Sequence, residues 1–227
     1  MNWEDEQIIE WPDIVKQEHV GQKGMNFDIN PKYSIILMSR RDNAPYRDMI
    51  YDDGITIEYE GHDVPKDYYK QHDQEFFTPS GSLTENGKFA QAVGHYKKTG
   101  QARKVKVYEK IIPNQWSYKG MFDLIDVKKV FDGNRNVFRF ILRLSDGSQT
   151  TSSLNSVEKL PHTRLIPSAV KQEVYKRDKG RCVLCGSTEN LHFDHDLPFS
   201  KGGTSLSANN IRILCQSCNL KKSDKIE

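Results

Sequence analysis

Two C-x-x-C pairs near the end of the chain restrict its fold more than any other feature of the sequence. They contain all four cysteines of the 227 residues: Cys182 and Cys185 in "CVLC", and Cys215 and Cys218 in "CQSC". A disulfide framework would spread cysteines through a small secreted chain. A redox-active C-x-x-C would explain one pair and leave the other without a role. Two such pairs supply four thiolates for one tetrahedral Zn²⁺, so we expect a structural zinc site.

The composition suits a globular protein with a polar surface, because 36% of the residues are hydrophobic and 28% are charged. No segment approaches the ~18 consecutive apolar residues of a membrane span. The acidic start, "MNWEDEQIIEWPDIVKQ", is unlike a secretory signal. We therefore expect a cytoplasmic protein without a membrane partner. The net charge of +2 permits nucleic-acid binding without requiring it.

A polar stretch rich in Ser, Thr and Asn separates two regions of the chain. We expect a first domain at residues 1–145, a linker at 146–166 and a second domain at 167–227. The first region contains a helical stripe at 84–100 that Gly100 ends. Runs of β-branched and aromatic residues predict its strands, at 33–38, 54–61, 103–111, 120–131 and 136–144. This pattern predicts an α+β fold, with a curved antiparallel sheet or β-barrel carrying one or two helices.

The second region begins with a predicted helix that Ser168 can cap, with Val170, Val174 and Tyr175 at helical spacing. After the first cysteine pair, "LHFDH" and "NNIRILC" predict two short strands around the loop "SKGGTSLSA". The segment "QSCNLKKSDK" predicts a short helix or turn. A domain of about 60 residues has little core, so we expect zinc to contribute to its stability.

The order and spacing of these motifs resemble the HNH nuclease family in its four-cysteine form. The matching segments are "CVLC", "FDHDLPFSKGG", "NNIRILC" and "CQSCNLKK", within residues 166–223. The resemblance implies that a strand–loop–strand–helix unit holds one divalent ion, with Asp194 and Asn219 as its ligands. It also implies that His195 is the general base and that Asn210 braces the loop carrying this base. Two oxygen ligands favour Mg²⁺ or Mn²⁺ as the catalytic ion and leave Zn²⁺ to the thiolates.

Residues of this motif also have explanations without catalysis. A single histidine is more often structural than catalytic, and Asp196 is more simply a loop or capping residue than a third metal ligand. The Gly-Gly pair after it can satisfy a turn. Lys201, Lys221 and Lys222 could contact phosphates, and they could equally be solvated.

Residues 24–145 resemble SRA (SET and RING-associated) domains, which bind modified cytosine in DNA. The resemblance lies in "YSIILMSRRDNAPYRDMIYDDGITIEYEGHD", in "NGKFAQAV", and in the strands from "RKVKVYEKI" to "NVFRFILRL". The usual "YDG" of the family is "YKG" here, at residues 118–120, and the stretch before "YDDG" is longer than usual. The resemblance implies that a modified cytosine is flipped out of the duplex and inspected in a pocket.

A pocket for a flipped cytosine needs aromatic faces and a carboxylate or amide for the Watson–Crick edge. Tyr46 and Tyr59 are the candidate faces, and Asp48 is the candidate partner of the cytosine amino group, with Asp42 and Asp52 as rivals. Tyrosines in strands are also common core or cross-strand residues.

Basic residues gather in three segments that could follow a DNA backbone: the loop "SRRDNAPYR", the run "KKTGQARKVKVYEK" and the Gly-Gly loop. The candidates are Arg40, Arg41, Arg47, Lys104, Lys106 and Lys201. A solvated edge strand protected by lysines is the alternative for the second segment.

The two resemblances together imply a prokaryotic, modification-dependent DNA endonuclease that acts on duplex DNA carrying 5-methylcytosine or 5-hydroxymethylcytosine, as a defence against phage. Cutting two strands with one-metal sites favours a homodimer. One alternative is an HNH nuclease whose first domain is an EVE-like fold or reads unmodified sequence. Another is a zinc-stapled DNA-binding module without catalysis. Asp194, His195 and Asn219 together favour the nuclease, because zinc binding needs none of them.

Overall fold

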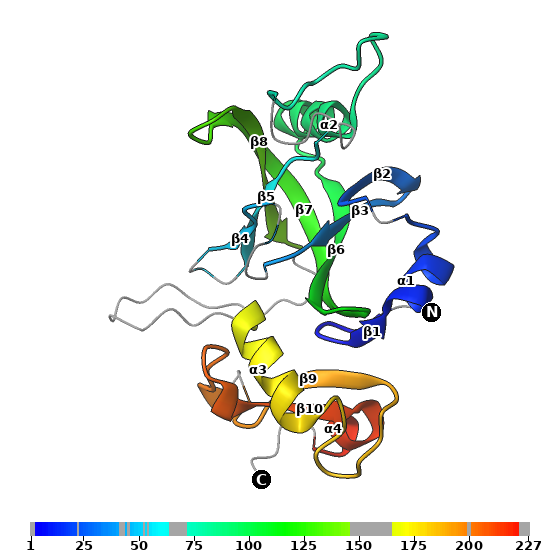
Figure 1. The fold of residues 1–227 in the computed structure, drawn as a ribbon, viewed down its shortest axis with the longest axis vertical. Coiled ribbons are helices and arrows are strands. Elements are labelled where there is room, and N and C mark those ends of the chain that lie inside the picture. Colours follow the sequence, from blue (N-terminus) through cyan, green and yellow to red (C-terminus); the bar gives the residue numbers. More distant parts are fainter. Residues whose placement is uncertain are drawn as a thin grey trace.

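The computed structural model describes residues 3–21, 23–40, 44, 46–51, 53, 55–63, 72–145, 165–198 and 201–222. Most of the predicted linker, at 146–164, lies outside these ranges. The described elements form two bodies (Figure 1). We call β1 to β8 with α1 and α2 the N-terminal body, and α3, β9, β10 and α4 the C-terminal body. In the described ranges, no helix has the length and apolar character needed to cross a membrane.

An eight-stranded sheet dominates the N-terminal body. Its strands are β1 (Ile8–Glu10), β2 (Met25–Asn30), β3 (Tyr33–Met38), β4 (Met49–Ile50), β5 (Thr56–Glu60), β6 (Arg103–Ile112), β7 (Gln115–Phe131) and β8 (Asn136–Leu144). The order is β2-β3-β6-β7-β8-β5-β4, and β1 pairs with the start of β7. Helix α1 (Trp11–Glu18) follows β1 directly, and α2 (Glu85–Thr99) lies at one end of the sheet (Figure 1).

The predicted α+β class and the large sheet are confirmed, with two corrections. The pair β3–β6 is parallel, because the chain passes through β4, β5 and α2 before it returns beside β3. Among the described residues the sheet is open, with β2 and β4 at its edges, so it is not a closed barrel.

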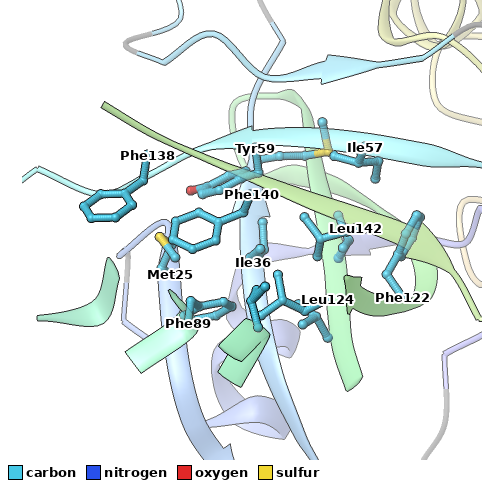
Figure 2. Packing of buried hydrophobic residues seen from close by; sticks show 14 of the residues in the cluster. Met25, Ile36, Ile57, Tyr59, Phe89, Phe122, Leu124, Phe138, Phe140 and Leu142 are labelled. Atoms are coloured by element: carbon cyan, nitrogen blue, oxygen red, sulfur yellow. The ribbon is translucent and has the colours of Figure 1, made fainter. Parts of the chain in front are cut away.

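The main hydrophobic core lies between the sheet and α2 (Figure 2). Phe89 of α2 is fully buried there, with its ring 5.8 Å from that of Phe140 at 62°. Thr84 caps the helix, since its Oγ1 accepts a hydrogen bond from the backbone N–H of Gly87 at 3.0 Å. Gly100 ends it in the left-handed conformation, as the sequence predicted.

The C-terminal body contains α3 (Ser168–Asp178), β9 (Leu191–His195), β10 (Ile211–Cys215) and α4 (Gln216–Lys222). Its two strands pair antiparallel, and all four elements agree with the predicted ones. The prediction that Ser168 caps α3 is wrong. Pro167 occupies the cap position, and the Ser168 hydroxyl instead donates a hydrogen bond to Glu109 of β6.

The N-terminal segment joins the two bodies. The carbonyl of Glu6 accepts a hydrogen bond from the backbone N–H of Phe193 at 3.2 Å, and Gln7 forms an antiparallel bridge with His192. Ile8, which begins β1, packs into the hydrophobic core of the C-terminal body. Strand β9, which ends in the predicted catalytic residues, therefore has the N-terminal segment beside it.

Four charged side chains lie buried or nearly buried at the same junction: Glu6, Glu109, Lys119 and Lys171, which we call the junction cluster. Lys171 of α3 pairs with Glu6, and its Nζ lies 3.5 Å from Glu109. Lys119 of β7 lies 3.2 Å from Glu109 and 3.7 Å from Glu6. Burial acts to raise the pKa of Glu109, but the charges of the two lysines overcome it and lower the pKa to about 2. Both carboxylates are therefore anions that need both ammonium groups.

Candidate functional site

The four cysteines meet in one cluster, as predicted. Their sulfur atoms all lie within 4.8 Å of one another, and the Sγ atoms of Cys185 and Cys215 are 3.6 Å apart. Four thiolates about 2.3 Å from one Zn²⁺ give similar sulfur–sulfur separations. Burial acts to raise the pKa of Cys182, but backbone N–H groups directed at its sulfur lower it to about 6. The cluster is thus suited to a structural zinc ion.

Asp194 and His195 are the last two residues of β9, where the strand gives way to the loop that follows. The imidazole Nε2 of His195 is 2.8 Å from the hydroxyl of Ser205, which is buried. This contact fixes the orientation of the ring. Both predicted catalytic side chains are partly exposed, so a substrate can reach them.

Asn210 joins the two ends of the loop after β9 through its side-chain hydrogen bonds. Its Oδ1 accepts a hydrogen bond from the N–H of Leu197 at 2.8 Å. Its Nδ2 donates to the carbonyl oxygens of Leu197 at 3.2 Å and Thr204 at 3.0 Å. Gly203 is required at the same place, because a Cβ there would lie 1.8 Å from the Leu197 carbonyl oxygen. The loop is therefore held by contacts that a larger residue at position 203 would break.

A positive charge already lies at the predicted metal site. The Nζ of Lys222 is 2.5 Å from Oδ2 of Asp194 and also contacts the carbonyl oxygen of His195. A carboxylate and a carbonyl oxygen are the kind of ligands that Mg²⁺ and Mn²⁺ use. Asn219 lies three residues before Lys222 on α4, the spacing of neighbours on one helical face, and it is partly exposed. These residues fit a divalent cation.

Comparison with protein families identifies part of the chain. Residues 182–225 match the family model described as HNH endonuclease. This segment is therefore similar to HNH endonuclease domains. The match covers the cysteine cluster, both strands and α4, and therefore every residue of the predicted catalytic motif. No curated protein matches the chain.

Several solved structures share a loose likeness in shape. The SRA domain of SUVH5 in complex with fully methylated CG DNA is 17% identical, over 62% of this chain and 87% of that chain, with a TM-score of 0.44. The Type IV phosphorothioation-dependent restriction endonuclease ScoMcrA is 16% identical, over 98% of this chain and 59% of its own, with a TM-score of 0.42. Arabidopsis thaliana SUVH6 with SAM is 17% identical, over 86% of this chain and 32% of its own, with a TM-score of 0.44.

The three residues predicted for a base pocket border a single cavity in the N-terminal body. Tyr46, Asp48 and Tyr59 all line a cavity of about 200 Å³. The same cavity is bordered by Trp11, Gly24, Leu37, Ser39, Lys110, Asn114 and Trp116. Tyr46 and Asp48 also line an adjoining open groove of about 910 Å³, so the cavity lies beside a wide surface channel.

Asp48 has a strongly perturbed carboxyl group. Burial raises its pKa to about 7, although the backbone N–H groups of Glu60 and Ser39 donate to its carboxylate at 3.2 Å. A carboxyl group that changes its protonation state near neutral pH in a cavity is typical of a functional site. The neutral form can donate a hydrogen bond to one edge atom of a base and accept one from the next.

Tyr59 belongs both to the main hydrophobic core and to the wall of the cavity. Within this core the residue is 1% exposed (Figure 2). Its hydroxyl lies close to Gly24. A Cβ at position 24 would lie 2.3 Å from that hydroxyl oxygen. Tyr59 therefore forms the inner wall of the cavity, and Tyr46 is the more exposed of the two predicted aromatic faces.

The predicted DNA-backbone residues do not share one surface. Arg40 and Arg47 line the open groove, and Lys201 is exposed in the loop after β9. Lys104 is exposed and pairs with Asp123 of β7 at 2.7 Å. Arg41, Asp42 and Asp52 lie outside the described residues.

The prediction that Lys106 contacts the DNA backbone is wrong. The ammonium of Lys106 is nearly buried, lies 2.7 Å from Glu18 of α1, and is 4.2 Å from the centre of the Tyr33 ring. Strand β6 is central in the sheet, so the alternative of an edge strand protected by lysines is also wrong. The ion pair with Glu18 directs the Lys106 side chain to α1.

Sequence reasoning missed Ser205, Trp11 and Trp116, and it considered Lys222 only as a phosphate contact or a solvated lysine. Ser205 and Lys222 contact the catalytic motif, and Trp11 and Trp116 border the cavity with ring centroids 5.4 Å apart. The available signal for Trp11 was a large aromatic residue in the acidic N-terminal segment. The signal that Lys222 could contact the catalytic motif was its position three residues after Asn219, on the same helical face.

Proposed function

We propose that this chain is a modification-dependent DNA endonuclease. In this proposal the N-terminal body binds 5-methylcytosine or 5-hydroxymethylcytosine flipped from duplex DNA, and the HNH domain hydrolyses a phosphodiester bond nearby. Recognition of modified cytosine is supported by one observation. Tyr46, Asp48 and Tyr59 line a single cavity beside a wide groove. These residues belong to the segment that resembles SRA domains.

The cavity has the chemistry that a flipped cytosine needs. Extrusion of a base costs a few kcal/mol, which stacking and edge hydrogen bonds in the pocket must offset. Tyr46 supplies an aromatic face, and the Asp48 carboxyl lies inside the cavity to meet the Watson–Crick edge. Arg40 and Arg47 on the groove wall supply positive charge for the DNA backbone.

The HNH domain contributes the hydrolytic residues. Asp194 and Asn219 would hold Mg²⁺ or Mn²⁺, which stabilises negative charge on the phosphate and on the leaving oxygen when bound. His195, oriented by Ser205, takes the proton from the attacking water. Asn210 keeps the loop beside the base in place, and Zn²⁺ on the four thiolates holds the strands and α4 together.

The proposal includes a homodimer, because each chain offers one hydrolytic site and a duplex has two strands. It also places the enzyme in a prokaryotic cytoplasm, where it would act on phage DNA that carries modified cytosine.

The test is a cleavage assay on one duplex prepared with cytosine, 5-methylcytosine, 5-hydroxymethylcytosine or glucosylated 5-hydroxymethylcytosine, in Mg²⁺ or Mn²⁺. Wild-type protein is compared with His195→Ala, with Asp48→Ala, and with Glu75→Ala, an exposed carboxylate outside the groove, as a matched control. We expect cleavage of methylated or hydroxymethylated duplexes only, its loss in His195→Ala, and loss of discrimination in Asp48→Ala. Equal cleavage of all four duplexes would refute the modified-base reader. Binding without cleavage under every condition would refute the nuclease.

A further inference from the structure

Lys222 occupies an unusual position for a lysine at the end of a short helix. Its side chain is 1% exposed, and its two described partners are the carboxylate of Asp194 and the carbonyl oxygen of His195. An ammonium group is a compact point charge with three donors and no acceptor. It is held here by the oxygen atoms on which the proposed divalent ion depends.

The ammonium and a divalent ion cannot share this position. The Nζ lies 2.5 Å from Oδ2 of Asp194, while Mg²⁺ binds carboxylate oxygens at about 2.1 Å. Two cations on the same side of one carboxylate repel each other, and this repulsion is weakly screened at a buried group. Binding of the ion therefore requires the Lys222 side chain to move away from Asp194.

We propose that Lys222 is a positioning residue that balances the charge of Asp194 in the metal-free site and transfers to a DNA phosphate oxygen when the divalent ion binds. This inference rests on the proposed function and extends it. The four-carbon stem lets the ammonium move without movement of α4, and a phosphate oxygen is a good partner for a lysine. No proton or covalent bond is transferred in this exchange.

The exchange has a consequence for the order of binding. Without DNA, no phosphate is present to replace Asp194 as the partner of the displaced ammonium. The loss of that ion pair opposes binding of the divalent ion, so Lys222 weakens it. With DNA, a phosphate receives the ammonium and the penalty falls. Lys222 thus makes binding of the ion and binding of DNA favour each other.

The test measures Mn²⁺ affinity on zinc-loaded protein, from the electron paramagnetic resonance signal of free Mn²⁺. Lys222→Met is compared with wild type and with Lys221→Met, an exposed neighbour on the same helix. We expect Lys222→Met to bind Mn²⁺ about tenfold more tightly without DNA, the scale of one hydrogen bond to a charged group. Lys221→Met should equal wild type, and Lys222→Arg, which keeps the charge, should stay near wild type.

A second arm adds a modified duplex in a His195→Ala background, which prevents cleavage. The duplex should increase Mn²⁺ affinity when Lys222 is present and much less in the Lys222→Met form. Equal or weaker Mn²⁺ binding by Lys222→Met without DNA overturns the inference. Asp194→Asn distinguishes failure of this inference from failure of the proposed catalytic site. If Asp194→Asn leaves Mn²⁺ binding unchanged in every background, the proposed catalytic site itself is wrong.

Discussion

Removal of one ammonium from the junction cluster should destabilise the protein strongly. Lys171→Met keeps a side chain of similar length on α3, so loss of volume contributes little. The variant leaves Glu6 and Glu109 with Lys119 as their remaining partner in the cluster, and a net negative charge at a buried site. Breaking a buried ion pair by removing one partner costs about 3–5 kcal/mol. Burial, together with repulsion from Lys119, lowers the pKa of Lys171 to about 8, so its charge is only partly compensated. We therefore expect the cost to lie at the lower end of this range, as a loss of about 3 kcal/mol in the free energy of unfolding.

The measurement is urea-induced unfolding of zinc-loaded protein at pH 7, followed by tryptophan fluorescence. Lys176→Met, at an exposed position of the same helix, is the control and should stay within about 0.5 kcal/mol of wild type. The double variant Lys171→Met with Glu6→Gln restores the charge balance and should recover about 1 kcal/mol or more. A Lys171→Met protein as stable as the control, or a double variant no better than the single one, would refute this reasoning.

The pH dependence gives an independent check on the same variant. In wild type the pKa values of Glu6 and Glu109 are lowered from their usual 4.5, against the effect of burial, by the charges of Lys119 and Lys171. Their contribution to stability is present above about pH 4.5 and is lost as the pH falls toward 2. Without Lys171 the pKa values of Glu6 and Glu109 are lowered less. The free energy of unfolding of the variant therefore falls less over that pH range. The difference between the two proteins should shrink as the pH falls.

Three further predictions concern the two sites. Removal of zinc with a chelator, or Cys218→Ser, should abolish hydrogen-exchange protection of β9 and β10, because four thiolates on one ion replace much of a small core. Gly24→Ala should abolish binding of modified DNA in a titration, because its Cβ would lie 2.3 Å from the Tyr59 hydroxyl oxygen and must displace a cavity wall. The unfolding free energy of Asp48→Asn relative to wild type should rise by about 3 kcal/mol from pH 5 to pH 8. Burial raises the pKa of Asp48 to about 7 from its usual 3.8, so the wild type alone loses stability across that range.

Elements stabilised by their own local pattern were predicted well. Strand β3 matches its predicted range of 33–38, and α2 begins and ends within one residue of the predicted stripe. Strands β1, β2 and β4, helix α1 and the first five residues of β7 were missed. The segment before Trp11 is acidic and carries no alternating pattern, so only its pairing with β7 makes it a strand.

The same difference separates the two candidate sites. The HNH residues lie within one continuous run of motifs, so their order and spacing were enough to identify them. Trp11 and Trp116 reach the cavity from distant parts of the chain, and no local pattern encodes that contact.

The departure from the family's "YDG" has a structural explanation that the sequence could not provide. Val107 pairs with Gly120 and Tyr108 with Tyr118, so Lys119 is the extra residue of a β-bulge. Its ammonium lies in the junction cluster, 3.2 Å from Glu109. The lysine therefore belongs to the contact between the two bodies.

The bridge made by Glu6 and Gln7 affects how this protein can be divided. A nuclease fragment cut at the start of α3 would lack the backbone partners of His192 and Phe193, and it would expose the apolar surface that Ile8 covers. A chimera that replaces the whole N-terminal body would lose the same residues. Fusion of a different DNA-binding domain to this nuclease therefore requires that the first ten residues be retained or supplied as a separate peptide.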